Sequence, residues 1–278
     1  MHPTGTKQIS MRFLLLVCLL LTASTGQQTS PTPATGAAAP SNQQSNQQKA
    51  RAVVDQMIAA LGGQNYLNVQ DSYSEGRYGR FHNDVMVGQA KYFRYWKWPD
   101  SDRWEITDQR DIVQLFIGDK ATEVTWQGAR LMNPDKEENV RQWLIRRHYT
   151  LEIVLRSWLN EPGTLLLDEG QSLAENRMAE KITIINSRNE AVSLLVSVDT
   201  HLPVQKIFTV RDPQTHDRDE EIEIFDSWRM VQGVNTPFND LIKRNGQLVR
   251  QQFVFNVTYN NHPPDSIFEP KLIRSPKK

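Results

Sequence analysis

The residues most able to bind an ion are carboxylates gathered around one histidine. The acidic residues that flank His216, in a predicted hairpin turn, are Asp212, Asp217, Asp219, Glu220 and Glu221. Carboxylate oxygens are the ligands that calcium prefers, but this segment lacks the spaced ligands and central glycine of a calcium loop. We therefore interpret it as a solvated hairpin tip.

The other reactive residue types show no catalytic arrangement. The histidines lack a zinc-ligand spacing such as His-Glu-x-x-His, and no Gly-x-Ser-x-Gly elbow suggests serine catalysis. Paired carboxylates such as Glu137-Glu138 and Asp168-Glu169 lie in predicted helix starts or turns, where acidic residues favour the helix dipole or face solvent. The sequence predicts no catalytic residue, no metal, no cofactor and a non-enzymatic protein.

Apolar side chains offer a different chemistry, the binding of hydrocarbon. In residues 250–259 the alternation predicts a strand with Phe253, Phe255, Val257 and Tyr259 on one face. Residues 221–230 repeat the pattern. Candidates for an apolar lining are these four side chains together with Ile222, Ile224 and Trp228 from the second segment and Trp143 and Trp158 from a helical segment. A filled core made of the same side chains remains an equal alternative.

One predicted strand carries aromatic residues on both faces. These residues are Tyr92, Phe93, Tyr95, Trp96 and Trp98. Trp and Tyr suit boundaries that are apolar on one side and wet on the other, which is typical of a cavity mouth. Structural cation–π contacts with Arg94 and Lys97 are the alternative, and the pattern favours that alternative.

Helical spacing marks two parts of the chain. Apolar residues from Ala50 to Leu61 recur at that spacing and stop at Gly62-Gly63, which indicates an amphipathic helix. A second stripe follows the Asn133-Pro134 start signal, runs from residue 140 to 159, and has a predicted break near Thr150. This insert is either core packed across a sheet or a movable lid over a cavity.

Strand patterns flank this helical insert on both sides. Before it we expect five strands, at residues 72–81, 87–98, 103–108, 112–117 and 121–126. After it we expect seven, at 165–168, 177–186, 191–199, 204–211, 220–230, 236–244 and 249–259. Short loops imply antiparallel pairing, and a sheet of ten to twelve strands must curl, split or close. The predicted fold is α+β: a wide curved antiparallel sheet forming an incomplete half β-barrel, with helices packed across its concave face.

The N-terminal segment has the order of a secretory signal. Lys7 and Arg12 precede an apolar run from Phe13 to Leu21 that is too short for a transmembrane anchor, and small residues follow it. We expect a signal peptide at 1–26, a disordered Gln/Ser/Pro/Ala-rich linker at 27–48, and a single domain at 49–278. The only cysteine, Cys18, lies in the signal, so the exported chain would lack a disulfide.

Charge argues against a nucleic-acid partner. Lys plus Arg and Asp plus Glu both number 32, and no basic stripe is evident.

The order of these elements resembles the LolA/LolB-like superfamily of periplasmic lipoprotein-localisation proteins. Local phrases agree with it over about residues 48–272: Trp126-Gln127-Gly128, then the segments 199–206, 225–237 and 256–261. The superfamily also includes sensors of envelope stress. The resemblance implies an incomplete β-barrel with helices across its mouth and an apolar cavity for acyl chains.

Two functions follow as hypotheses. The first is an exported, periplasmic, non-enzymatic carrier or chaperone that binds acyl chains of a lipoprotein or lipid in a half-barrel cavity. The second is an envelope protein-interaction or stress-sensing module of the same fold that transports no lipid. An envelope hydrolase is the least favoured interpretation.

Overall fold

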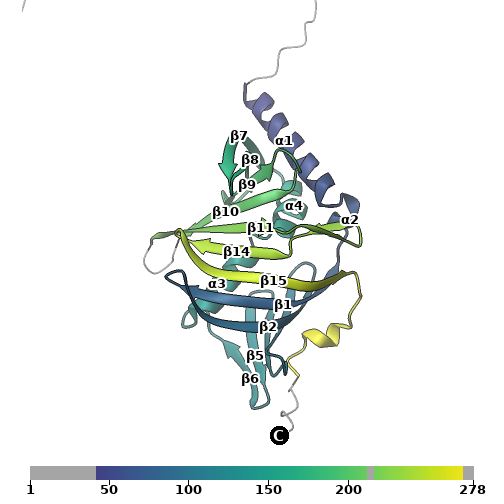
Figure 1. Ribbon diagram of the computed structural model, residues 1–278, viewed down its shortest axis with the longest axis vertical. Coiled ribbons are helices and arrows are strands. Elements are labelled where there is room, and N and C mark those ends of the chain that lie inside the picture. The colour runs from purple at the N-terminus through teal and green to yellow at the C-terminus, as the bar shows by residue number, and fades with distance from the viewer. Residues whose placement is uncertain (1–41, 212–215, 272–278) are drawn as a thin grey trace, which may run out of the picture. The chain divides into compact units, whose positions relative to one another are not determined.

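The computed structural model describes residues 42–211 and 216–271, shown as coloured ribbon in Figure 1. The predicted signal peptide, the linker up to residue 41 and Asp212 lie outside the described residues. Among the described helices, none has the length and apolar character needed to cross a membrane.

Thirteen strands form one antiparallel sheet in the order β6-β5-β4-β3-β2-β1-β15-β14-β11-β10-β9-β8-β7. The first half contains β1 (Asp71–His82), β2 (Val85–Lys97), β3 (Ser101–Ile106), β4 (Ile112–Ile117), β5 (Lys120–Thr125) and β6 (Gly128–Met132). The second contains β7 (Leu165–Ala174), β8 (Arg177–Ile185), β9 (Ala191–Ser197), β10 (Pro203–Arg211), β11 (Arg218–Asp226), β14 (Asn239–Arg244) and β15 (Gln247–Tyr259). β6 and β7 are its two edges, so the sheet does not close. The predicted half-barrel is therefore confirmed.

The two halves of the sheet meet where the first strand pairs with the last. β1 lies between β2 and β15, as Figure 1 shows, so residues at opposite ends of the chain form the middle of the sheet. Two short strands, β12 (Arg229–Val231) and β13 (Val234–Thr236), form a separate ribbon. We predicted one strand over 220–230, but the left-handed backbone of Ser227 (φ 57°) ends β11 before that ribbon begins.

The helical insert is divided where the sequence predicts a break. It consists of α3 (Glu138–Arg147), α4 (Leu151–Arg156) and a 3₁₀ turn, η1 (Trp158–Asn160). The Thr150 hydroxyl caps α4 by accepting a hydrogen bond from the Ile153 amide at 3.4 Å. α3 starts at Glu138 rather than at Pro134, because the intervening residues form a turn closed by the Glu137 amide donating to Asn133 O.

Helix α1 (Asn42–Leu61) includes residues 42–48, which we predicted to belong to a disordered linker. The Asn46 side chain donates to Asp168 O at 2.7 Å and accepts from the Asp168 amide at 2.9 Å. This pair of bonds fastens the helix to β7. The correction has a physical reason: a polar sequence can be ordered when a neighbouring strand satisfies its amide groups.

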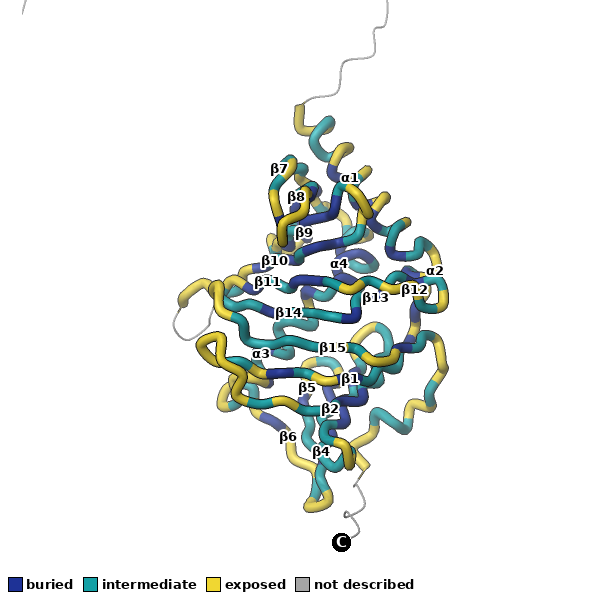
Figure 2. The backbone as a smooth tube through the Cα atoms, viewed as in Figure 1, coloured by how far each residue is buried: buried dark blue, intermediate teal, exposed yellow. Residues whose placement is uncertain are grey.

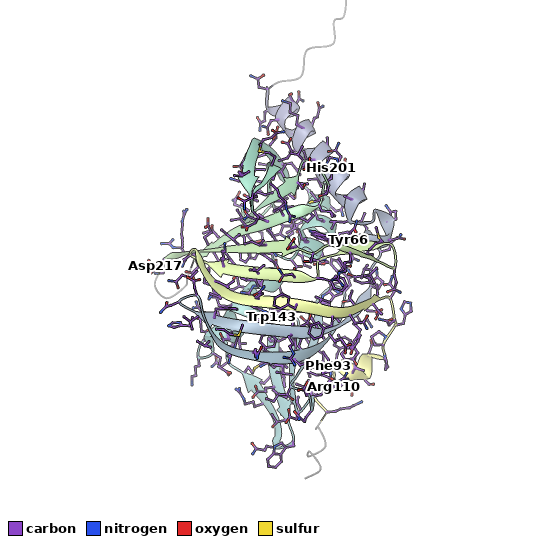
Figure 3. All side chains as sticks on the ribbon, in the orientation of Figure 1. Tyr66, Phe93, Arg110, Trp143, His201 and Asp217 are labelled. Carbon is purple, nitrogen blue, oxygen red and sulfur yellow. The ribbon has the colours of Figure 1, made fainter. Side chains whose placement is uncertain are left out.

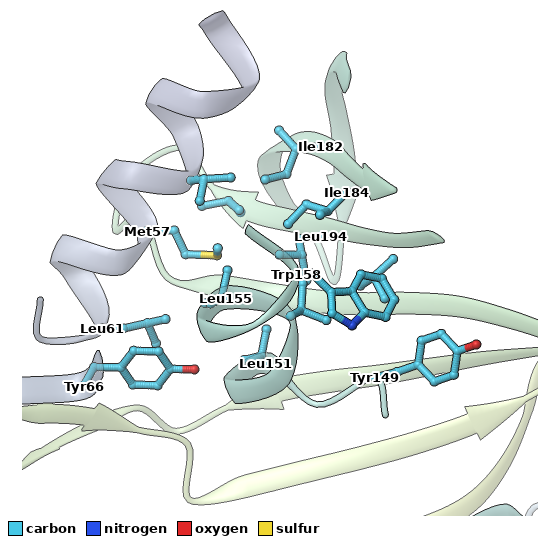
Figure 4. Packing of buried hydrophobic residues seen from close by; sticks show 14 of the residues in the cluster. Met57, Leu61, Tyr66, Tyr149, Leu151, Leu155, Trp158, Ile182, Ile184 and Leu194 are labelled. Atoms are coloured by element: carbon cyan, nitrogen blue, oxygen red, sulfur yellow. The ribbon is translucent and has the colours of Figure 1, made fainter. Parts of the chain in front are cut away.

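The largest core cluster lies between the helices and β7–β10. It includes Met57 and Leu61 of α1, Leu155 of α4 and Ile182 and Leu194 of the sheet (Figure 4). Trp158 belongs to this cluster and is 1% exposed. Figure 2 shows this half of the structure with buried residues along β8 to β11 and exposed residues at the hairpin tips. Two short helical elements complete the fold, α2 (Gln64–Leu67) and η2 (Asp265–Phe268).

Candidate ligand-binding cavity

The other half of the curved sheet and helix α3 form a half-open cavity of about 680 Å³. Its volume falls within the range that is usual for ligand sites, roughly 300 to 1,000 Å³. Its apolar lining is Tyr78, Phe81, Val87, Trp104, Ile106, Phe116, Val140, Trp143 and Val249. Its polar lining is Arg80, His82, Gln114, Asn139, Gln142, Arg146, Arg244 and Arg250. The combination of hydrocarbon walls and convergent polar groups suits an amphiphilic ligand.

Trp143, which is labelled in Figure 3, belongs to α3 and contacts the sheet across this cavity. Its ring meets Trp104 edge-on at a centroid distance of 5.1 Å and Phe116 at 5.6 Å. Trp104 also packs against Tyr92 at 5.1 Å. The indole nitrogens of Trp104 and Trp143 are both buried and have no hydrogen-bond partner among the described residues. These two N–H groups remain free for an acceptor.

Ion pairs fix most of the charges on the inner face of the sheet. Arg94 binds Asp102 through two hydrogen bonds of 2.9 and 3.0 Å. Lys206, which is buried, pairs with Glu223 of β11. Burial on its own would raise the pKa of Glu223, but the charge and hydrogen bond of Lys206, together with the charges of Arg146 and Arg250, hold that pKa below its ordinary range. Pairing of this kind makes a charged interior tolerable.

Arg250 differs from these residues because it forms no ion pair with a carboxylate of the described residues, although its charge acts at longer range on Glu223 and Asp240. Among the described residues its one hydrogen bond runs from Nη2 to Gln252 Oε1 at 2.7 Å, and its Nε is buried with no partner. Its guanidinium carbon lies 5.0 Å from the ring centroids of both Trp104 and Trp143. Burial, helped by the like charges of Arg146 and Arg94, lowers the pKa of Arg250 to about 10.

A second cavity, of about 210 Å³, lies between the sheet, α4 and the β12–β13 ribbon. Val257, Tyr259 and Trp228 line it, together with Val254 and the buried Tyr66. The Tyr259 hydroxyl shares a hydrogen bond with Thr236 Oγ1 at 2.7 Å, and burial raises the pKa of Tyr259 to about 12.

The nine predicted lining residues are therefore distributed over five environments. Trp143 lines the large cavity, and Val257, Tyr259 and Trp228 line the small one. Trp158 lies in the filled core. Ile222 and Ile224 alternate with Glu223, which lines the small cavity, so they point to the opposite face of β11. Phe253 and Phe255 are 45% and 56% exposed.

A β-bulge separates the four residues that we placed on one face of β15. The pairing register shifts so that Glu75 lies opposite Asn256 while Gly76 lies opposite Val254, which leaves Phe255 as the extra residue. Before the bulge Gln252 and Val254 face the cavity, and after it Val257 and Tyr259 do. The predicted single apolar face is corrected, because simple alternation cannot continue through an unpaired residue.

The aromatic strand β2 faces the interior with Tyr92, which is fully buried. Arg94 lies over Trp104 of the neighbouring strand, with 5.0 Å from its guanidinium carbon to the ring centroid. Lys97 instead pairs with Asp265 of η2. Sequence reasoning missed Trp104 and the cavity-lining arginines, since an arginine on a half-buried strand has the same pattern as one that faces solvent. In the described part of the chain, no three His, Cys, Asp or Glu side chains converge as a metal site would require.

Comparisons with known proteins are limited to structure. No family model matches the sequence, and no curated protein sequence matches it. A DUF1329 family protein from Desulfovibrio piger is 13% identical, with a TM-score of 0.54 over 79% of this chain and 97% of that chain. A domain described as outer membrane lipoprotein-sorting, from Vibrio parahaemolyticus, is 7% identical, with a TM-score of 0.55 over 80% and 97%.

A third solved structure, a LolA superfamily protein from Nitrosomonas europaea, is 11% identical with a TM-score of 0.49 over 79% of this chain and 97% of that chain. At identities this low, the first two structures show a shared fold and leave function open. The fold that this chain shares with the DUF1329 family protein and with the lipoprotein-sorting domain is its unclosed antiparallel sheet with packed helices.

Proposed function

We propose that this protein is an exported, non-enzymatic carrier that holds an acyl chain of a lipid or lipoprotein in the 680 Å³ cavity, within the periplasm. The cavity itself is the observation that carries the proposal. A chain sheltered there gains about 0.8 kcal/mol for each buried CH₂. About ten buried CH₂ groups would therefore contribute on the order of 8 kcal/mol.

A carrier must also release its cargo, and α3 is the element suited to open. This short helix supplies Val140, Trp143 and Arg146 to the cavity wall. Arg146 pairs with the sheet residue Glu221, and two further contacts fasten the helix: Glu138 with Arg244 at 3.9 Å and Arg147 donating to Gly118 O at 2.8 Å. Rupture of these contacts and withdrawal of Trp143 would open the cavity further without disturbing the core around Trp158.

The experiment has two steps. First, organic extracts of protein exported to a bacterial periplasm and purified without detergent are analysed by mass spectrometry, beside an unrelated exported protein. Then binding of a fluorescent fatty acid is compared in Val249→Trp, which fills the large cavity, and in Phe255→Glu on the same strand. We expect Val249→Trp to weaken binding about tenfold or more and Phe255→Glu to leave it unchanged, since Phe255 is 56% exposed.

A partner-binding or sensing module is the second candidate. The exposed pair Phe253 and Phe255 favours it, because two aromatic side chains on an open sheet face suit a protein contact. Empty extracts from folded protein, together with equal probe binding in both variants, would favour this module over the carrier.

A further inference from the structure

The large cavity is electropositive as well as apolar. The described residues that line it include four arginines, Arg80, Arg146, Arg244 and Arg250, and His82, but no aspartate or glutamate. Arg146 and Arg244 share the carboxylate of Glu221, with Nη2–Oε2 distances of 2.8 and 3.5 Å. Arg244 also lies 3.9 Å from Glu138 Oε1, so both of these arginines are paired with carboxylates, whereas Arg250 forms no ion pair with a described carboxylate. A cavity that stored only hydrocarbon would have no use for this excess of positive charge.

Unpartnered hydrogen-bond donors gather at the same place. Arg250 Nε, Trp104 Nε1 and Trp143 Nε1 are buried without partners among the described residues, and all three residues line the cavity. Each of these atoms donates a hydrogen bond and none accepts one. Buried donors are normally satisfied, so two indole N–H groups beside the unpartnered Nε of one guanidinium define a place for an acceptor.

Aromatic rings compensate the Arg250 charge only in part. Tyr78 lies 5.4 Å from its guanidinium carbon and Trp104 and Trp143 lie at 5.0 Å each. The electrostatic attraction of a ring face is weaker than that of a carboxylate or phosphate bound by two N–H groups. Burial and neighbouring cations already lower the pKa of Arg250 to about 10, which reflects how poorly its charge is balanced.

We propose that the cargo of this cavity is an anionic amphiphile, whose carboxylate or phosphate head binds Arg250 and the two indole N–H groups while its chain lies along the apolar walls. This rests on the proposed carrier function and specifies its cargo. Phe116, Ile106 and Val249 supply hydrocarbon walls beside the guanidinium, so head and chain can be bound together.

Calorimetric titration of the full exported chain tests the inference with four probes. Lauric acid and lauroyl lysophosphatidic acid carry an anionic head and a chain, monolauroylglycerol carries a neutral head and a similar chain, and glycerol 3-phosphate carries a head alone. Each is titrated at about pH 8, where the carboxylate is ionised. The proteins are wild type, Arg250→Met, and Arg77→Met as control, because Arg77 is exposed and lies opposite Phe253 on the outer side of β1.

We expect wild type and Arg77→Met to bind the anionic amphiphiles about tenfold or more tightly than the neutral one. Arg250→Met should lose this preference while its affinity for monolauroylglycerol stays within about threefold. Retained binding of the neutral probe also establishes that the variant is folded. The two anionic amphiphiles distinguish a carboxylate from a phosphate head.

Failure of the anion site and failure of the carrier function give different results in this experiment. If wild type binds neutral and anionic amphiphiles equally, or if Arg250→Met keeps the preference, the anion site is wrong and the carrier stands. If no amphiphile binds, the carrier itself is wrong. Arg250-dependent binding of glycerol 3-phosphate alone would replace the amphiphile with a free phosphate ester and overturn the inference.

Discussion

Arg146 of α3 donates two hydrogen bonds to the Glu221 carboxylate of β11, Nε–Oε1 at 2.5 Å and Nη2–Oε2 at 2.8 Å. Their side chains are 12% and 4% exposed. This contact joins helix α3, one wall of the cavity, to the sheet. Its strength bears on stability and, under the proposed carrier function, on cargo release as well.

Removing one charge of this pair should destabilise the protein. Glu221→Gln leaves Arg146 buried without its counter-charge, and we expect the free energy of unfolding in urea to fall by about 3 kcal/mol. Asp55→Asn is the control, since Arg51 and Asp55 form an exposed pair (51% and 55%) and its loss should cost less than about 1 kcal/mol. Equal losses in the two variants would contradict the structural role of the buried pair.

Gly76 should tolerate no side chain, because it lies where the bulge of β15 meets β1. A Cβ there would lie 1.9 Å from Phe253 O and 2.9 Å from the Tyr92 hydroxyl. We expect Gly76→Ala to lower the free energy of unfolding by about 2 kcal/mol or more. Gly88→Ala is the matched control in the neighbouring strand, where the nearest atom, Arg80 Nη2, is 3.4 Å from the added Cβ. If both variants melt alike, the bulge is placed wrongly.

Asp240 makes stability depend on pH. Burial and the Glu223 charge hold its pKa well above the ordinary 3.8, so the folded state retains a proton that the unfolded chain releases. Stability is then fully present below the unfolded pKa and declines as the pH rises toward the folded pKa. We expect Asp240→Asn to gain stability over wild type progressively above about pH 4. Thermal unfolding from acid to neutral pH measures this, and a constant difference between the two proteins would refute it.

Asn46 should anchor the start of α1. Its two hydrogen bonds to the Asp168 main chain lie partly buried, so Asn46→Ala should lower the free energy of unfolding by about 1 to 3 kcal/mol. Gln48→Ala, in the same helix and exposed, should change it by less than about 0.5 kcal/mol. Hydrogen exchange at the amides of α1 should accelerate only in the first variant. Unchanged exchange there would mean that this end of the helix needs no anchor.

Local patterns in the sequence determined much of the architecture. The alternation at Ile112–Ile117 predicted β4 with its observed bounds, and the break at Thr150 separates α3 from α4. These features depend on neighbours within a few residues, because strand alternation and helix capping act over that range. The edge strand β6 escaped prediction, since Leu131 on it is 74% exposed and only Met132 at its end is buried, so its sequence shows no alternation.

Which residues line the cavity was decided by the tertiary structure alone. Whether Phe255 faces inward depends on a bulge against β1, and β1 and β15 lie at opposite ends of the domain in sequence. The role of Arg250 depends likewise on Trp104 and Trp143, which come from a different strand and from a helix. Sequence patterns report the face on which a residue lies relative to its own strand. Only the pairing of distant strands determines which face is enclosed, and so which charges are left without a partner.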